Sequence, residues 1–528
     1  MTTLYVVIEI LETEMRLIVT TLYVVIAILF ARSATAYSLQ PGLLSRRSVT
    51  TKLLLSAFSS SLVNPTQEFT TTMRTSCPNS SHLLRIVFNG GDNMLGRAVQ
   101  LSFPVQSPGE ADITDSCPAS HYLDLALHPS AHPDGDPSID KIRRLNTEGK
   151  YLWNDYRNIS IDPPPDLRLL NFESHITETI DNEDVPTLKG IRYHTHIGNL
   201  DAMLRPYAET THGTVKSSPV VVSVANNHVM DYGRIALERE TIPALVKLEK
   251  DIPSLKAVGC GRNFLQASMP AMFDFGPKGR VEVFAASSGC SGTPDNWSAK
   301  ADRSGLVGLP GLYDASAVEE AVKIVKRAIG LHSSLACEAG RLRILSIHMG
   351  PNWAMKHETE SEIACRREFC HRIIEECGVD IVYGHSSHHS RGMEVHKGKL
   401  ILYGTGDIIN DYEGFENRGE EKYNKLGGIY VADIDPSSGD FKQLMVIPMY
   451  MNRLRLERFT ERSQIWNPNE KRLVKGNERG SDLAHFVNNM SMIDAGGEDA
   501  ALKVHYVKEE ESPIKGGPVL LSSNTEVG

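Results

Sequence analysis

Short apolar runs alternate with helical patterns along the chain from about residue 83 onwards. The apolar runs have the length and the content of β-branched residues that are typical of buried strands. The expected strands are LLRIVFN at residues 83–89, Leu167–Leu170, Val220–Val224, Val281–Ala286, Leu342–Ile347 and Val379–Tyr383. Apolar residues at helical spacing predict helices at Ile235–Leu248, Ala315–Ile329 and Glu362–Cys377. This alternation is typical of an α/β fold.

The pattern changes late in the chain, where pairs of apolar runs are joined by turn residues. MEVHKGKLILYG at residues 393–404 predicts a hairpin that turns at Lys397-Gly398. GGIYVADIDPSSGDFKQLMVIPM at residues 427–449 predicts a second hairpin, which turns through Pro436 to Gly439. The sequence therefore predicts an α/β core that is closed by antiparallel hairpins.

One main domain is expected at residues 83–455. Within it, residues 104–160 contain several prolines and glycines and few apolar periods, so we expect an insertion there. After residue 455 the chain becomes polar, and residues 456–528 are expected to form an irregular C-terminal tail with mobile last residues.

The N-terminal region has the layout of a secretory signal peptide. The uncharged run LIVTTLYVVIAILFA at Leu17–Ala31 follows Arg16 and precedes Ala34-Thr35-Ala36, which has the small-x-small pattern of signal cleavage. We expect residues 1–36 to be the signal, with Met15 as the natural start, and residues 37–82 to be a flexible leader. The expected destination is the secretory pathway, either secreted or lumenal. The alternatives are an uncleaved signal anchor and an organelle that is reached by the secretory route.

Composition and charge narrow the class of protein. Of the 528 residues, 41% are hydrophobic and 23% are charged, which is typical of a globular protein. The net charge of −10 argues against nucleic acid or an anionic membrane as a partner, and no later run is long enough for a stable membrane span after signal removal. Eight cysteines are too few for a disulfide scaffold of this length.

Polar side chains follow directly after three of the expected strands. Asp92 lies in NGGDNMLGR after the first strand, and Glu173 lies in NFE after the second. Each of these, taken alone, is equally well explained by a helix cap or a solvated strand end. ANNHVMDYG after the third strand contains Asn227, His228 and Asp231. Because amides and an imidazole next to a buried strand need partners, a functional role is favoured there.

Histidines end two further strands. His348 ends RILSIH, where a single histidine is more often structural. GHSSHH follows VDIVY and contains His385 and His388, for which the alternative is a histidine-rich surface turn. Imidazole and carboxylate ligands together suit zinc, manganese or iron. Such a mixed set is what a hydrolytic centre with two divalent metal ions requires.

Five segments taken together resemble the CapA family, which is named after the bacterial poly-γ-glutamate capsule synthesis protein. They are GDNMLGR at 91–97, NFESHIT at 171–177, ANNHVMDYG at 225–233, SIHMGPNW at 346–353 and YGHSSHHSRGMEVHKGKLILYGTGDIIND at 383–411. The resemblance covers roughly residues 83–412. It implies a relationship to the calcineurin-like metallophosphoesterases, whose fold is a β-sandwich flanked by helices with a two-metal site.

The resemblance also implies roles for individual residues. The expected metal ligands are Asp92, Glu173, Asn227, His348, His385 and His388. His228 resembles the catalytic acid of the superfamily, and Asp231 is placed with it as the second catalytic candidate. The sequence departs from the family at Asp407, which stands in GTGD where the family more often has asparagine.

We therefore expect a metal-dependent hydrolase that acts in poly-γ-glutamate or related exported-polymer metabolism. Its substrate would be an anionic polymer or a small ester or amide. The alternative is a non-catalytic polymer-binding or assembly module that retains the fold, and tightly bound metal would distinguish the hydrolase from it. A glutamyl ligase is disfavoured, because the sequence contains no G-x-x-x-x-G-K-[ST] loop for phosphate.

Overall fold

The computed structural model describes most of the chain after residue 82. The described residues are 83–112, 117–127, 138–187, 189–214, 216–332, 340–352, 358–412, 427–460, 464–467, 472–515 and 517–522. The expected signal peptide, the start at Met15 and the leader at 37–82 lie outside these residues. Among the helices that are described, none is long and apolar enough to cross a membrane.

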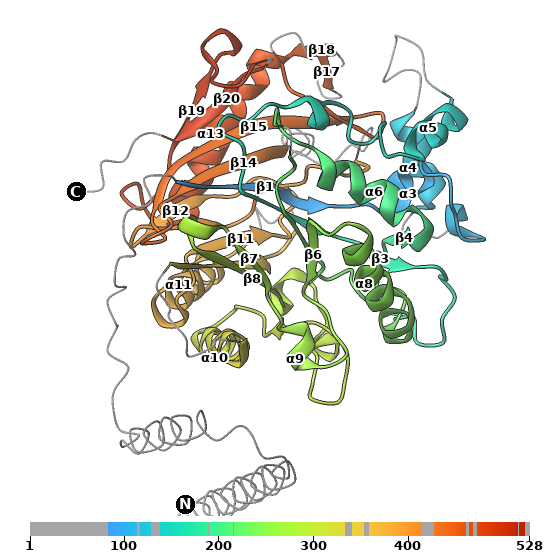
Figure 1. The fold of residues 1–528 in the computed structure, drawn as a ribbon, viewed down its shortest axis with the longest axis horizontal. Coiled ribbons are helices and arrows are strands. Elements are labelled where there is room, and N and C mark those ends of the chain that lie inside the picture. Colours follow the sequence, from blue (N-terminus) through green and yellow to red (C-terminus); the bar gives the residue numbers. More distant parts are fainter. Residues whose placement is uncertain are drawn as a thin grey trace, which may run out of the picture. The chain divides into compact units, whose positions relative to one another are not determined.

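The first of two large sheets is mixed and has β1 near its centre (Figure 1). Its spatial order is β19-β20-β15-β14-β1-β2-β5-β6, with β16 beside β15. Strands β1, β2, β5 and β6 are parallel, whereas β14 and β15 form the antiparallel hairpin that the sequence predicted. The bounds are β1 Leu84–Asn93, β2 Leu167–Phe172, β5 Val220–Ser223, β6 Leu255–Val258, β14 Gly427–Ile434, β15 Phe441–Asn452, β16 Arg455–Arg458, β19 Val504–Val507 and β20 Val519–Ser522.

The second sheet has the order β12-β13-β11-β10-β8-β7, with β9 beside β8. Strands β8, β10, β11 and β13 are parallel, and β12 and β13 form the other predicted hairpin. The bounds are β7 Ala271–Asp274, β8 Arg280–Ser288, β9 Gly308–Leu309, β10 Arg341–His348, β11 Ile381–His385, β12 Met393–His396 and β13 Lys399–Leu402. Two small pairs are β3 His175–Thr177 with β4 His194–His196, and β17 Gln464–Asn467 with β18 Arg472–Lys475.

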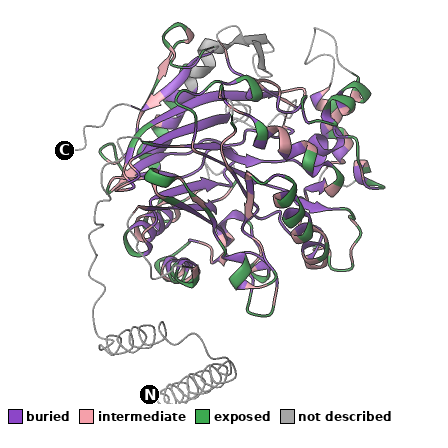
Figure 2. Ribbon diagram, in the orientation of Figure 1, coloured by how far each residue is buried: buried purple, intermediate pink, exposed green. Residues whose placement is uncertain are grey.

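The two sheets pack face to face, and helices cover their outer faces (Figure 2). Side chains alternate along each strand, so that Ile86 and Ile344 lie in the core between the sheets, while Val87 and Ile347 face outwards. The first outer layer contains α3, α4, α6 and α8, and the second contains α10 and α11. This is an α/β fold built as a β-sandwich flanked by helices, the architecture that the resemblance implied.

The three predicted helices are present close to their predicted ranges, and further helices occur that the sequence pattern did not predict. The first predicted helix is split into α7, a π-helical segment at Leu237–Thr241 and α8, which has Pro243 near its start. α11 begins with a capping box made by Thr359 and Glu362. The bounds are α3 Arg97–Leu101, α4 Ala119–Ala126, α5 Ile139–Asn146, α6 Ile197–Glu209, α7 Arg234–Ala236, α8 Ile242–Asp251, α9 Phe264–Ala267, α10 Ala315–His332, α11 Glu360–Cys377 and α13 Gly476–Asp494.

The C-terminal segment differs from the irregular tail that the sequence suggested. Helix α13 packs Leu483, Phe486, Val487 and Met490 into the core between the sheets, and β19 and β20 extend the first sheet. Residues 138–158, within the expected insertion, place Trp153 and Tyr156 in the outer core beside the first sheet. Both segments are therefore parts of the folded domain.

Candidate functional site

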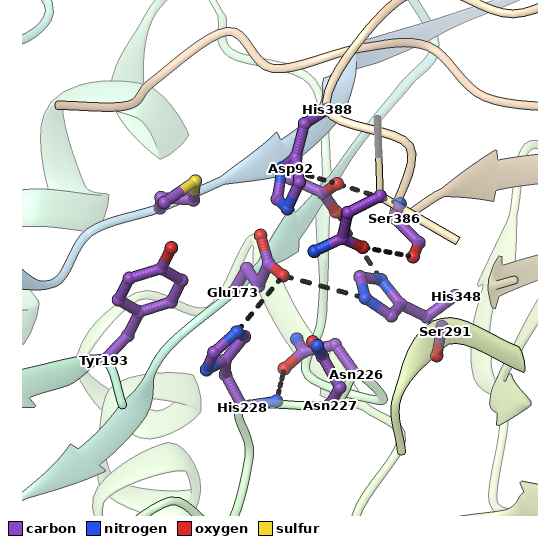
Figure 3. Close-up of polar contacts among 12 residues, drawn as sticks. Asp92, Glu173, Tyr193, Asn226, Asn227, His228, Ser291, His348, Ser386 and His388 are labelled. Carbon is purple, nitrogen blue, oxygen red and sulfur yellow. Dashed lines mark hydrogen bonds and ion pairs between the residues drawn. The ribbon is translucent and has the colours of Figure 1, made fainter. Parts of the chain in front are cut away.

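The polar residues at the strand ends meet at one edge of the two sheets (Figure 3). Strands β2 and β5 end shortly before Glu173 and Asn227, and β10 and β11 end at His348 and His385. Asp92 lies near the end of β1, after an irregularity in the pairing with β2 between Phe88 and Asp92. Gly90 permits this irregularity, because its φ is 62° and a Cβ there would lie 2.8 Å from Ile408 Cβ.

Asp92 is fully buried and faces two groups of potential ligands. Its Oδ1 lies 3.5 Å from His348 Nδ1 and 3.8 Å from His385 Nδ1, whereas its Oδ2 lies 3.5 Å from His388 Nδ1. The ligand atoms of Asp92, His348 and His385 lie within 4.8 Å of one another, and so do those of Asp92, His388 and Asp407. A carboxylate shared by two groups suits the bridging of two metal ions. These buried groups could hold metal.

Hydrogen bonds fix the orientation of Asp92 and of the histidine loop that follows β11. Asn171 Nδ2 donates to Asp92 Oδ1 at 2.8 Å, and the backbone N–H of Ser386 donates to Asp92 Oδ2 at 2.8 Å. Ser386 and His388 have φ values of 101° and 56°, which are unusual for residues other than glycine. Strained backbone of this kind is held only where the surroundings enforce it, and it is frequent at active sites.

Several buried acceptor and donor atoms of this centre have no hydrogen-bond partner within the part of the chain that the structure describes. They are Glu173 Oε1, Glu173 Oε2, Asn227 Oδ1 and His348 Nε2. Glu173 Oε1 lies 3.6 Å from His348 Nε2 and 3.8 Å from His228 Nε2. Buried polar atoms without partners are costly, so a convergent set of oxygen and nitrogen atoms fits a bound cation.

His228 lies beside these atoms, and Asp231 and Lys189 contact its Nδ1 atom. Its Nδ1 contacts Asp231 Oδ2 at 2.5 Å, and Asp231 Oδ2 also accepts from the backbone N–H of Tyr193 at 2.7 Å. The ammonium group of Lys189 contacts Asp231 Oδ1 and the backbone carbonyl of Asn227, and it lies 3.2 Å from His228 Nδ1. The Nε2 atom of His228 therefore faces Glu173, on the side of the potential metal ligands (Figure 3).

Burial dominates the acid–base properties of the centre. It raises the pKa of Asp92 to about 7, against the lowering effect of His388, and it raises the pKa of Glu173 well above its ordinary range. Burial lowers the pKa of His385 to about 3. At His388, burial acts to lower the pKa, but Asp407 and Glu173 outweigh it and raise the pKa to about 10.

A surface pocket of about 760 Å³ adjoins this centre. Lys189, Arg234 and Trp297 are among the residues that line it. Lys189 joins the pocket to the centre, because its ammonium group contacts Asp231 and the backbone of Asn227. A group bound in the pocket would therefore lie near His228 and Asn227.

All eight residues singled out from the sequence lie in this region, and their roles as ligands or catalysts stay predictions. The part that Asp407 plays was not predicted, although GTGD follows an apolar run in the same way as the other site residues. Asn226, one of the two amides in ANNH, was not assigned a role, and its Nδ2 donates to Asn171 Oδ1 at 3.0 Å. Lys189 was not predicted either, because it comes from a loop with no recognisable motif.

Comparison with known proteins gives consistent results. Residues 86–412 match the family described as "Bacterial capsule synthesis protein PGA_cap". Proteins from two strains of Mycobacterium tuberculosis, each named "Probable polyglutamine synthesis accessory protein", are 31% identical over 388 residues, which are 72% of this chain and 88% of each relative.

Two solved structures also match the chain. A phosphatase from Mycoplasma pneumoniae is 12% identical, with a TM-score of 0.32, and the match covers 70% of this chain and 95% of that one. The anchor in the inner membrane complex of Plasmodium is 9% identical, with a TM-score of 0.28, and the match covers 71% and 88%. The family match covers more than half of the chain and contains every segment on which the resemblance rested. The chain belongs to the bacterial capsule synthesis family, which is the CapA family that its motifs indicated.

Proposed function

We propose that this protein is a metal-dependent hydrolase that acts in poly-γ-glutamate or related exported-polymer metabolism. The observation that carries the proposal is the convergence of three carboxyl groups and three imidazoles, with unpartnered buried atoms among them. A purely structural polar cluster would satisfy its own hydrogen bonds, whereas both oxygens of Glu173 have no donor among the residues that the structure describes.

The donor set fits two divalent cations. Asp92, His348 and His385 would hold one ion, and Asp92, His388 and Asp407 would hold the other, with Glu173 and Asn227 completing the shell. Manganese, zinc and iron all accept such a mixture of nitrogen and oxygen ligands. When bound, the two ions would lower the pKa of a water molecule and neutralise charge on a phosphoryl or acyl group.

His228 and Asp231 supply the proton-transfer chemistry in this proposal. Asp231 holds Nδ1 of the imidazole, so the ring is fixed with Nε2 directed at the reacting region. Lys189 and the backbone N–H of Tyr193 in turn hold Asp231. A histidine oriented in this way can carry a proton between Nε2 and a leaving group, which contributes typically about 10²–10⁴-fold to the rate.

The pocket next to the centre supports an anionic polymer or a small ester or amide as the substrate. Lys189 and Arg234 supply positive charge to its wall, and Trp297 supplies an apolar surface. The relatives named as polyglutamine synthesis accessory proteins point to a role in polymer synthesis or export. A secreted or lumenal location would place the enzyme where an exported polymer is found.

One observation favours the alternative, a polymer-binding or assembly module without catalysis. Asp92, Glu173, His348 and His385 are completely buried, and Asn227 is only 7% exposed. Within the described residues these four side chains are shielded from solvent, so a substrate in the adjoining pocket would contact them only after a local movement. If that movement does not occur, the metal would serve only to hold the fold together.

Metal analysis combined with two variants decides between the two functions. His385→Ala should lower the metal content, whereas His228→Ala should spare the metal and reduce turnover by about 10²–10⁴-fold. Turnover would be measured on a panel of phosphoesters and γ-glutamyl amides. His505→Ala, at an exposed position on β19, serves as the matched control. Full metal content with no turnover on any member of the panel would support the module and contradict the hydrolase.

A further inference from the structure

A second group of imidazole and carboxylate side chains lies where α11 passes over the edge strand β12. His371 and Glu375 are four residues apart on α11 and so project from the same side of the helix. Glu394 and His396 are two residues apart on β12 and so project from the same face of the strand. None of these four residues belongs to the centre around Asp92.

The side chains contact one another directly. His371 Nε2 lies 2.7 Å from Glu394 Oε1, and His396 Nδ1 lies 3.9 Å from the same oxygen. One nitrogen of each imidazole and one oxygen of Glu394 are all within 4.8 Å of one another. Donors that bind one zinc ion at about 2.0–2.2 Å are themselves at most about 4 Å apart. A small adjustment would therefore bring these three atoms onto one ion.

Neighbouring side chains orient the second polar atom of two of the three ligands, His396 and Glu394. His396 Nε2 lies 2.7 Å from Glu375 Oε1, which leaves Nδ1 directed at Glu394. The hydroxyl group of Tyr403 donates to Glu394 Oε2 at 2.7 Å, which leaves Oε1 for the ion. Carboxylate partners of this kind fix the ring of a metal-binding histidine and raise its basicity. Glu394 itself is buried, so its negative charge calls for a nearby cation.

The two imidazole rings lie against each other. They are stacked with centroids 3.7 Å apart and planes at 7°. Their nitrogens can converge on one ion when the rings tilt out of the parallel stack. The side chains of His371 and His396 are 26% and 18% exposed, and rotation about χ2 is soft, so this tilt is open to them.

We propose that His371 Nε2, His396 Nδ1 and Glu394 Oε1 form a zinc site that joins α11 to β12, with a water molecule as the fourth ligand. Glu375 and Tyr403 orient the ligands. The site is separate from the proposed hydrolytic centre and does not depend on the proposed function. Its effect is to cross-link a helix of the outer layer to the edge strand of the second sheet.

Zinc content per chain tests this site. The protein would be loaded with zinc, dialysed, and analysed by mass spectrometry for metal. His371→Ala and His396→Ala should each lose one zinc ion relative to the wild type, and His505→Ala should lose none. His385→Ala should lose zinc from the hydrolytic centre and keep the ion at His371 and His396, so the two sites are distinguished.

Thermal unfolding provides a second measurement that does not depend on stoichiometry. Added zinc should raise the Tm of His385→Ala by less when His396→Gln, which keeps a side chain of similar volume, is introduced as well. The group of Asp92, His388 and Asp407 is present in both proteins, so the difference between the two rises reports on the site at His371 and His396. Glu375→Gln should weaken zinc binding by about 10–100-fold without abolishing it. Equal zinc content in the wild type, His371→Ala and His396→Ala, or an equal zinc-induced rise in Tm with and without His396→Gln, would overturn the proposal.

Discussion

Asp494, the last residue of α13, connects that helix to the loop that carries His388. It accepts hydrogen bonds from Arg391 Nη2 at 2.7 Å, from the backbone N–H of Gly392 at 2.8 Å and from Arg366 Nη2 at 3.2 Å. Burial by itself would raise the pKa of Asp494, but the charges of Arg391 and Arg366 outweigh it and lower the pKa to about 2. The negative charge of Asp494 therefore stabilises the folded protein.

The size of this effect follows from the pKa. Asp494→Asn imitates the protonated carboxyl group, because the amide is neutral and has nearly the same shape. The pKa falls from 3.8 to about 2, and one pKa unit corresponds to about 1.4 kcal/mol. We expect Asp494→Asn to lower the free energy of unfolding by roughly 2–3 kcal/mol. Asp494→Ala should cost about 3–5 kcal/mol, because the backbone N–H of Gly392 then loses its acceptor and Arg391 keeps only its ion pair with Glu358.

The free energy of unfolding of both variants is measured by urea denaturation, which is monitored by circular dichroism. The folded pKa is depressed, so the contribution of Asp494 is fully present above the unfolded pKa of about 3.9. It is lost as the pH falls through the folded pKa of about 2. The difference between wild type and Asp494→Asn should be constant near neutral pH and shrink in acid. Asp499→Asn, at an exposed position after α13, is the control.

The variant should also affect the metal centre, because Arg391 lies three residues after His388. Asp494→Asn should bind metal more weakly than the wild type, whereas Asp499→Asn should not. If Asp494→Asn unfolds within about 0.5 kcal/mol of the wild type, the range typical of neutral surface changes, the reasoning from burial and charge is refuted.

Three further predictions concern the metal centre. Asp407→Asn should weaken metal binding by at least about 10-fold in a titration with zinc or manganese, because Asp407 Oδ1 lies 2.9 Å from His388 Nδ1. Unchanged affinity would contradict a role for Asp407 in holding the metal. Gly384→Ala should lower both Tm and metal content. The Cβ of the new alanine would lie 2.5 Å from the backbone oxygen of Tyr403 and would displace His385. A Tm equal to that of the wild type would show that the strand can adjust. Removal of metal with a chelator should lower the Tm. The loss of stability should be about 2.7 kcal/mol relative to the protein at a free metal concentration of 100 times Kd. A Tm that does not respond would argue against a stably bound ion.

Much of the fold could be predicted because the sheets are buried on both faces. Strands in such sheets are near-continuous apolar runs, so β2, β5, β10 and β11 were visible in the sequence, and both hairpins were marked by their turn residues. The convergence of Asp92, Glu173 and His348 followed from the same reasoning, because polar residues after parallel strands collect at one edge.

What could not be predicted depends on contacts between distant parts of the chain. The apolar residues of α13 at Leu483, Phe486, Val487 and Met490 have helical spacing, but the surrounding polar residues hid it. Lys189 reaches Asp231 from a loop whose path is set by packing and not by local pattern. Asp407 was visible as a departure from the family, but only its distance to His388 shows its part in the site.

The order in which the chain leaves the ribosome limits when the proposed metal centre can form. Strand β1, which carries Asp92, pairs with β14, and the register joins Leu84 to Ile434. These residues are about 350 positions apart, so at about 5–20 residues per second the partner of β1 emerges tens of seconds later. Until then one edge of β1 lacks the strand that it pairs with in the folded protein. The proposed ligands can therefore come together only after most of the chain has been made, and the compartment in which folding ends would set which metal ions are on offer.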